Sequence, residues 1–312
     1  MGTSPIRLSA VPLRHVLPRV QLIFKMAGNY FSRRTPGRGL APRLSLERRG
    51  LSALATDKQV SSEERQVDRL LRTYPRPRPD LAPEYERIFL DHYRSNRSSA
   101  GVLNGLVARL EGWMHKRVAE AAIPGAAILE IGAGTLNHVP YERQARLYDV
   151  VEPFRALWED SPHREAVRRI YGDINEVPDG VRYDRILSIA VLEHLTCLPS
   201  VVARCGTLLA DGGLFQAGIP TEGGTLWGAA WRSTTGVAFR LKRGLSYVPI
   251  MRHEHVNDAA EIEAVVAYLF AEVSMRRFPL PWRHLSFYTY IAARKVRLDR
   301  CRLLLQNVCA NR

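Results

Sequence analysis

Two glycines that follow a short apolar run are the first residues whose spacing suggests chemistry. Gly132 and Gly134 come directly after the run 127–131. A glycine has no Cβ, so it lets the backbone turn sharply and lets a ligand approach main-chain atoms closely. A dinucleotide loop would need a third glycine at position 137, where this chain has Asn137. The pair therefore favours a nucleotide-like ligand other than NAD or FAD, although a tight strand-to-helix turn would use the same glycines.

A carboxylate ends the second apolar run, which extends from position 147 to Glu152. Glu152 lies 18 residues after Gly134, and a carboxylate at the end of that strand can accept hydrogen bonds from both hydroxyls of a ribose. Asp149 competes for this role, but its place inside the run predicts a side chain that faces solvent or a helix. We therefore expect Glu152 to bind the sugar of the ligand.

A second acid, Asp173, follows the apolar run 168–171. A carboxylate at the end of a third strand can accept a hydrogen bond from the exocyclic amino group of a purine, which predicts an adenine contact. The alternative is structural, because Asp is also a common cap of a following turn or helix.

Histidines provide the candidate general bases. Glu193 and His194 follow the run 183–189, so a parallel sheet would place them at the mouth of the same crevice. His253 and His255 are further candidates, because a neutral imidazole can take a proton near pH 7. The alternative is a glutamate that starts a helix beside a packed histidine.

The histidines and cysteines do not have the spacing of a metal site. His194, Cys197 and Cys205 are close in sequence, but a fourth ligand and a second short spacing are missing. The cluster 252–255 lacks a partnering group of carboxylates. We expect no bound metal.

Seven short apolar runs predict the strands that position these residues. They are 127–131, 147–152, 168–171, 183–189, 214–219, 272–277 and 287–292. Helix-like stretches separate the runs, which is typical of a largely parallel sheet with helices on both faces. The predicted fold is therefore doubly wound α/β, with ligands at the carboxyl ends of the strands.

The whole chain divides into four segments. We expect an Arg-rich, disordered segment at 1–55, a helical extension at 56–122, a ligand-binding domain at 123–296 and a tail at 297–312, with an insertion at 220–256 in the position of a substrate lid. The aromatic and basic side chains of the insertion suit a sugar, a phosphorylated group or a lipid head group. A solvated basic face is the alternative.

The net charge of +14 is concentrated at the N-terminus. Residues 1–50 contain ten Lys and Arg against one acid, and the remaining residues carry 35 bases and 30 acids. This distribution argues against a nucleic-acid partner for the main domain. The basic segment resembles an organelle transit peptide, a region upstream of the true start, or a tail for nucleic acid or anionic lipid. Four scattered cysteines and the absence of a long apolar stretch indicate a cytoplasmic protein, with organelle targeting as the alternative.

The motifs in order resemble those of class I S-adenosylmethionine-dependent methyltransferases. They are Glu-Ile-Gly-Ala-Gly-Thr at 130–135, Val-Val-Glu at 150–152, Gly-Asp-Ile at 172–174, Val-Leu-Glu-His-Leu at 191–195 and Leu-Leu-Ala-Asp-Gly-Gly-Leu-Phe at 208–215. The resemblance covers roughly residues 126–295. It implies a Rossmann-like sheet of seven strands with the last strand antiparallel, preceded by the helical extension.

The same resemblance implies S-adenosylmethionine as cofactor and a role for each motif. Gly132 and Gly134 would lie beside the methionine part, with Glu130 orienting the loop. Glu152 would bind the ribose hydroxyls and Asp173 the adenine amine. The segment from Ala190 to His194 would line the site of methyl transfer.

The expected function is methyl transfer to a small-molecule or glycan acceptor, at oxygen, with nitrogen or carbon as the alternative atoms. The alternatives are a quinone or lipid methyltransferase, and a nucleic-acid-binding protein with a methyltransferase-like domain, for which the basic N-terminal segment is the evidence. We expect no nucleic-acid partner; peripheral membrane contact and the oligomeric state stay open.

Overall fold

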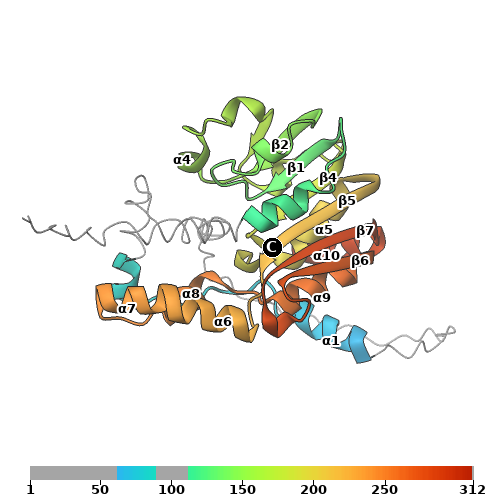
Figure 1. Cartoon of the computed structure of the whole chain (residues 1–312). Coiled ribbons are helices and arrows are strands. Elements are labelled where there is room, and N and C mark those ends of the chain that lie inside the picture. Colours follow the sequence, from blue (N-terminus) through green and yellow to red (C-terminus); the bar gives the residue numbers. More distant parts are fainter. Residues whose placement is uncertain (1–61, 89–111, 311–312) are drawn as a thin grey trace, which may run out of the picture.

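A computed structural model describes residues 62–88 and 112–310 of the chain (Figure 1). The expected disordered segment 1–55 therefore lies outside the described residues. Among the described helices, none is long and apolar enough to cross a membrane.

Seven strands form one mixed sheet. They are β1 Ala127–Ile131, β2 Leu147–Val151, β3 Arg169–Tyr171, β4 Tyr183–Ile189, β5 Leu209–Pro220, β6 Phe270–Pro279 and β7 Ser286–Val296. Their order in the sheet is β3-β2-β1-β4-β5-β7-β6, with β1 to β5 parallel and β7 antiparallel to both β5 and β6. The doubly wound sheet with its last strand antiparallel is confirmed.

The strand order reverses between β1 and β4, which are neighbours although two strands separate them in sequence. In an open α/β sheet a crevice forms at such a reversal, outside the carboxyl ends of the strands. The glycine loop follows β1, and the predicted Glu-His segment follows β4. The topology therefore brings these two motifs to the same place.

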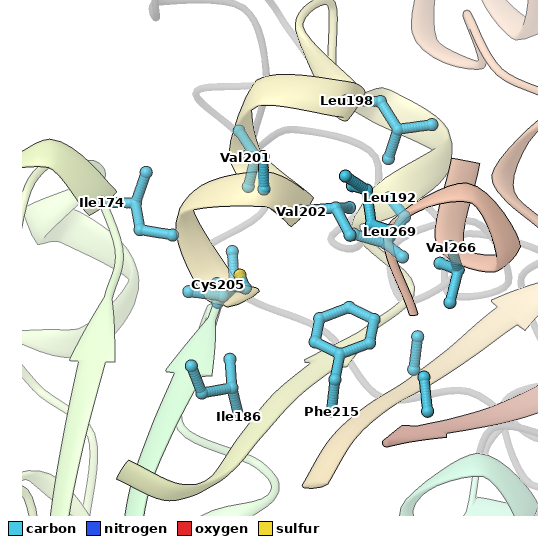
Figure 2. Packing of buried hydrophobic residues seen from close by; sticks show 14 of the residues in the cluster. Ile174, Ile186, Leu192, Leu198, Val201, Val202, Cys205, Phe215, Val266 and Leu269 are labelled. Carbon is cyan, nitrogen blue, oxygen red and sulfur yellow. The ribbon is translucent and has the colours of Figure 1, made fainter. Parts of the chain in front are cut away.

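Apolar side chains fill both faces of the sheet. Every residue of β1 is buried, as expected for a strand that is covered on two sides. On one face lie α5 (Leu198–Leu208), α9 (Ala259–Leu269) and α10 (Leu298–Ala310). Figure 2 shows Ile186 and Phe215 of the sheet in the same cluster as Cys205 of α5 and Leu269 of α9. On the other face lies the helix 112–119, which contributes Met114 to a second cluster.

Residues 297–312, expected as a tail, contain α10, which packs against α5. Close approach of these helices depends on Gly206, where an added Cβ would lie 2.9 Å from the Sγ of Cys301. Of the expected extension 56–122, the structure describes α1 (Ser62–Leu71), the helical residues 83–88 and the helix 112–119.

Arg185 and Glu142 form a buried ion pair, and Arg185 also connects β4 to β5 and to the helix 112–119. Arg185 of β4 is fully buried and donates to Glu142 at 2.6 Å. It also donates to the side chain of Gln216 on β5 and to the main-chain oxygen of Val118. Because the Arg185 guanidinium has carboxylate, amide and carbonyl acceptors, its burial is compensated.

Asp149 differs from its predicted environment. It is fully buried and accepts hydrogen bonds from Arg168 at 2.9 and 2.6 Å and from the hydroxyl of Tyr183 at 2.8 Å. The expectation that Asp149 faces solvent is therefore wrong, because Arg168, directly before β3, and Tyr183 of β4 supply polar partners to its buried side chain.

The insertion after β5 is helical. It contains α6 (Thr225–Trp231), a π-helical turn (Arg232–Gly236), α7 (Val237–Arg243) and α8 (Val248–Glu254). We call α6, this turn and α7 the arm; Figure 1 shows it along one edge of the molecule, beyond the ends of the strands. The arm has its own small apolar cluster, in which Phe239 contacts Tyr247 of the following loop.

Candidate functional site

The glycine loop after β1 turns as the sequence predicts. Gly132 and Gly134 have positive φ angles of 72° and 53°, a backbone conformation that a residue with a Cβ rarely adopts. The N–H of Gly132 donates to the main-chain oxygen of Val151 at 2.8 Å, which ties the loop to the end of β2. The loop is therefore fixed at the carboxyl ends of both strands.

Glu152, directly after β2, is the second fixed point of the loop. One carboxylate oxygen accepts the N–H of Gly134 at 2.9 Å and the other accepts the N–H of Phe154 at 2.9 Å. Glu152 is 2% exposed, and burial raises the pKa of its carboxyl to about 7, although the two backbone bonds act in the opposite direction. Each oxygen of the carboxylate can accept a further hydrogen bond, so hydroxyl donors can still bind.

Glu130, the acid of β1, is turned into the protein. Its carboxylate accepts the hydroxyl of Tyr148 on β2 at 2.8 Å, and burial raises its pKa. The charge of Glu130 also contributes to the raised pKa of Glu152. The two acids of the predicted site are therefore electrostatically linked.

Asp173 follows β3 and caps a short 3₁₀ helix, Ile174–Glu176. Its Oδ1 accepts the main-chain N–H of Asn175 at 2.7 Å and the amide of the same residue at 2.8 Å. This is the capping alternative raised from the sequence. Asp173 and Glu152 follow the adjacent strands β3 and β2, and the N–H of Glu152 donates to the main-chain oxygen of Tyr171 at the end of β3. The second carboxylate oxygen of Asp173 accepts neither of the two bonds from Asn175. A contact from this oxygen to adenine stays a prediction.

The chain leaves β4 through an unusual backbone conformation at Ala190. Its φ angle is 54°, and its N–H donates to the main-chain oxygen of Gly218 on β5 at 2.7 Å. A left-handed conformation at a non-glycine residue is uncommon and often lies at a functional site. The turn leads directly into the 3₁₀ helix Leu192–His194, which carries the predicted Glu-His pair.

Glu193 and His194 are both buried. Burial raises the pKa of Glu193 to about 8 and lowers the pKa of His194 well below its ordinary value of 6.5, so both groups are neutral near pH 7. The Nδ1 of His194 contacts the main-chain oxygen of Glu254 at 3.0 Å and therefore carries the proton. Its ring meets that of His255 edge to face, with 4.8 Å between centroids.

His255 is paired with a carboxylate that sequence reasoning missed. Its Nδ1 lies 2.8 Å from an oxygen of Glu222, which also accepts the indole N–H of Trp227. Burial opposes ionisation of Glu222, but these two donors and the charge of Arg232 outweigh it and lower the pKa of Glu222. A carboxylate on one ring nitrogen fixes the tautomer, with the basic lone pair on the other nitrogen.

His253 has a different environment. Its Nδ1 donates to the main-chain oxygen of Pro79 at 2.7 Å, in the segment that precedes the main domain. The structure thus brings His194 and His255 together, whereas His253 faces the segment Tyr74 to Pro79, which we call the strap.

Two arginines fasten the strap over the end of α8. Arg78 donates to the main-chain oxygens of His253, Glu254 and His194 at 2.7, 3.1 and 2.6 Å. Arg76 forms two bonds of 2.7 Å with the carboxylate of Glu261 on α9. The strap therefore holds α8 against the segment that carries His194.

Comparison with known proteins gives likenesses of fold. No protein-family model and no curated protein sequence matches the chain. Among solved structures, it is similar to an S-adenosylmethionine-dependent methyltransferase of Thermotoga maritima, described as a possible histamine N-methyltransferase, at 16% identity and a TM-score of 0.46 over 68% of this chain and 98% of the other.

Two further solved structures are similar over comparable lengths. One is a possible exported protein from Bordetella parapertussis, at 13% identity and a TM-score of 0.47 over 74% of this chain and 79% of the other. Another is the magnesium protoporphyrin IX methyltransferase of Synechocystis with bound S-adenosylhomocysteine, at 13% identity and a TM-score of 0.41 over 75% and 95%. At these identities the likeness does not extend to the acceptor.

The sheet itself decides the fold: the last strand, β7, is antiparallel, as the motif resemblance implied, and the structure places it between β5 and β6. The chain has the fold of class I S-adenosylmethionine-dependent methyltransferases. The residues present fit the cofactor of that family, S-adenosylmethionine. Gly132 and Gly134 have no Cβ at two positions of the loop, Glu152 retains acceptor capacity for hydroxyl groups, and Asp173 has a second carboxylate oxygen.

The sequence gives only a weak indication that Glu222 belongs to the site. It lies just beyond β5, so it follows the same rule of acids after strand ends that singled out Glu152 and Asp173. Its partner His255 is 33 residues away, at the far end of the insertion, and the sequence alone does not show that the two ends meet.

Proposed function

We propose that the chain transfers the methyl group of S-adenosylmethionine to an oxygen of a small-molecule or glycan acceptor. The observation that carries the proposal is the arrangement around Glu152, whose buried carboxylate receives the N–H of Gly134 from the glycine loop. The acid predicted to bind the ribose and the loop predicted to lie beside the methionine part therefore form one unit. This supports S-adenosylmethionine as the ligand of the crevice.

When bound, the cofactor supplies a methyl group that its sulfonium already activates. The protein then has to align the acceptor, exclude water and remove the acceptor proton. His255 is the best-placed base among the three predicted histidines, because the carboxylate of Glu222 accepts its Nδ1 proton and so makes Nε2 the basic nitrogen of the ring. The charge of Glu222 then stabilises the imidazolium that forms.

His194 supports this arrangement in the proposal. Because burial keeps its ring neutral, it packs against His255 without adding a second positive charge. His253, bound to the strap, is assigned to holding α8 in place. A quinone or lipid acceptor is the second candidate, favoured by exposed apolar side chains on the arm; partition of the accepted substrate between water and membrane would separate the two.

The test of the cofactor is calorimetric titration of S-adenosylmethionine and S-adenosylhomocysteine into the full chain, with NAD as control. Binding that is lost in Glu152→Ala and weakened in Asp173→Ala is expected. Absence of binding by well-folded protein would overturn the proposal and leave only the fold.

The test of the base follows once an acceptor has been found by screening. His255→Ala should lower kcat by about 10²-fold or more, the usual contribution of general-base catalysis. Glu222→Gln should lower kcat less and should change its pH profile, because Glu222 acts through His255. His253→Ala should leave kcat close to that of the parent. Unchanged turnover in all of His194→Ala, His253→Ala and His255→Ala would remove histidine from the mechanism.

A further inference from the structure

Helix α7 presents two apolar side chains to solvent. Leu241 is 84% exposed and Val237 is 48% exposed. They are four residues apart and so lie on the same face of the helix. Phe239, on the opposite face, is buried and makes the contact with Tyr247 that attaches α7 to the protein. The outward pair is therefore not needed to hold the arm together.

Basic side chains surround this apolar pair. Arg240, Lys242 and Arg243 are all exposed on the same helix. Helical geometry places Arg240 and Lys242 about 100° to either side of Leu241, so both can reach past it. The chain has no Asp or Glu between Glu222 and Glu254, so the arm itself contains no acid to neutralise these charges.

The turn between β6 and β7 extends the same kind of surface. Its exposed apolar side chains are Leu280, Trp282 and Leu285, with exposures of 43%, 63% and 44%. The turn lies against the start of α6, because the hydroxyl of Thr225 donates to the main-chain oxygen of His284. Figure 1 shows α7, α6 and this turn along one edge of the molecule.

We propose that this edge binds the surface of a bilayer that contains anionic lipids. We call it the arm face and define it by Val237, Arg240, Leu241, Lys242 and Arg243 of α7 and by Leu280, Trp282 and Leu285 of the β6–β7 turn. Apolar side chains inserted at the boundary between head groups and acyl chains, flanked by cations that reach the phosphates, are the pattern of interfacial membrane binding.

The charge of the arm face selects the bilayer over a second copy of the chain. In a symmetric dimer through this face, the three cations of α7 would meet the same cations of the partner, with no acid of the arm to compensate them. A nucleic acid would satisfy the cations but would leave Leu241 and Trp282 exposed without a role. An anionic bilayer accommodates both kinds of side chain.

The test is co-sedimentation of the full chain with vesicles. Phosphatidylcholine vesicles that contain phosphatidylserine should bind the chain much more tightly than vesicles of phosphatidylcholine alone, and salt should weaken the binding. Replacing Arg240, Lys242 and Arg243 together by Gln should weaken the partition coefficient roughly hundredfold, since each cation near the surface contributes about fivefold. Leu241→Ser should weaken it about tenfold or more, because the leucine no longer inserts.

A matched control removes the same charge elsewhere. Arg143, Arg146 and Arg169 are exposed near the start of β2 and β3, and their triple Gln variant should bind vesicles almost like the parent. The basic residues 1–50 are present in every variant, so their contribution is common to all. Melting curves and light scattering of each variant establish that folding and oligomeric state are unchanged.

Several outcomes would overturn the proposal. The first two are equal binding to both kinds of vesicle, and equal losses of vesicle binding in the α7 variant and the control variant. A third is that Leu241→Ser dissociates a dimer and leaves vesicle binding unchanged. The fourth is binding of RNA in preference to vesicles. The proposal is independent of methyl transfer, because no residue of the arm face is assigned to the cofactor or the base. Failure of vesicle binding would therefore leave the calorimetric test unaffected.

Discussion

Cofactor affinity should depend on pH through Glu152. Burial raises the pKa of this carboxyl to about 7 from an ordinary value of 4.5, which corresponds to a cost of about 3 kcal/mol for the ionised form. Because the folded-state pKa is raised, this group favours the folded protein below its ordinary value, and that contribution is lost as the pH rises to about 7. Ribose hydroxyls donate to the carboxylate and reverse the preference, so ligand binding should release a proton.

The expected magnitude follows from the fraction of carboxylate in the free protein. If only the ionised form binds well, the Kd for S-adenosylhomocysteine should rise roughly hundredfold between about pH 8 and about pH 5, a limiting slope of tenfold for each pH unit. Near pH 6, calorimetry in buffers of different ionisation enthalpy should detect the release of about one proton per ligand. Above pH 7 the affinity should level off.

Glu152→Gln is the matched variant for this prediction. It should bind S-adenosylhomocysteine more weakly at pH 8, since it loses charge-assisted hydrogen bonds worth about 1.5–3 kcal/mol each, and its affinity should not change with pH. A Kd in the parent that is the same at both pH values would refute the reasoning. The parent's pH profile retained in Glu152→Gln would instead assign the titration to Glu130, whose pKa is also raised by burial.

Three further changes test other parts of the structure. Asp173→Ala should weaken S-adenosylhomocysteine binding about tenfold and should lower the free energy of unfolding by about 1 kcal/mol, because the helix cap is lost. Asp173→Asn should keep the cap. Affinity like that of the parent in both variants would exclude the adenine contact. Arg78→Ala should lower the free energy of unfolding in urea by about 2–3 kcal/mol, because three carbonyl groups lose a charged donor; an unchanged midpoint would contradict this role of the strap. Arg185→Met should lower the free energy of unfolding by about 3–5 kcal/mol, because it leaves Glu142 buried without its cation. In a double-mutant cycle followed by thermal unfolding, adding Glu142→Gln should recover part of that loss. Additive losses would mean that the two residues are not coupled.

The cores of the strands were predictable because a strand buried on both faces has to be continuously apolar. The ends of β1 and β4 also lie where expected, but those of β5, β6 and β7 do not. The run expected at 214–219 belongs to β5, which starts at Leu209 and includes the positive φ angle at Gly212 and a register shift against β4. Such extensions depend on the neighbouring strand rather than on local apolar character. Asp149 is similar, since its contacts with Arg168, directly before β3, and with Tyr183 of β4 require the assembly of the four strands β3, β2, β1 and β4.

The cofactor side of the site was predictable for a related reason. In a parallel sheet the carboxyl ends of strands meet at one edge, so the position of Glu152 and of the glycine loop follows from the strands alone. The acceptor side was not predictable in the same way. Glu222 and His255 meet only after the insertion has folded, and Arg78 reaches His194 from a segment 116 residues earlier in the chain. Contacts of this kind have no local period in the sequence.

The meeting of Glu222 and His255 also has an evolutionary consequence. The two residues lie at opposite ends of the insertion and are hydrogen-bonded at 2.8 Å, so the insertion begins after β5 and ends before α9 at nearly one point. Loop closure free energy grows only slowly with loop length, so segments of different length or sequence can be exchanged between these anchors at little cost to the sheet. Substrate preference could then diverge by replacement of the whole insertion, while the residues around the cofactor stay the same. A chimaera that keeps both anchor residues and carries a foreign insertion should fold and retain its affinity for the nucleoside.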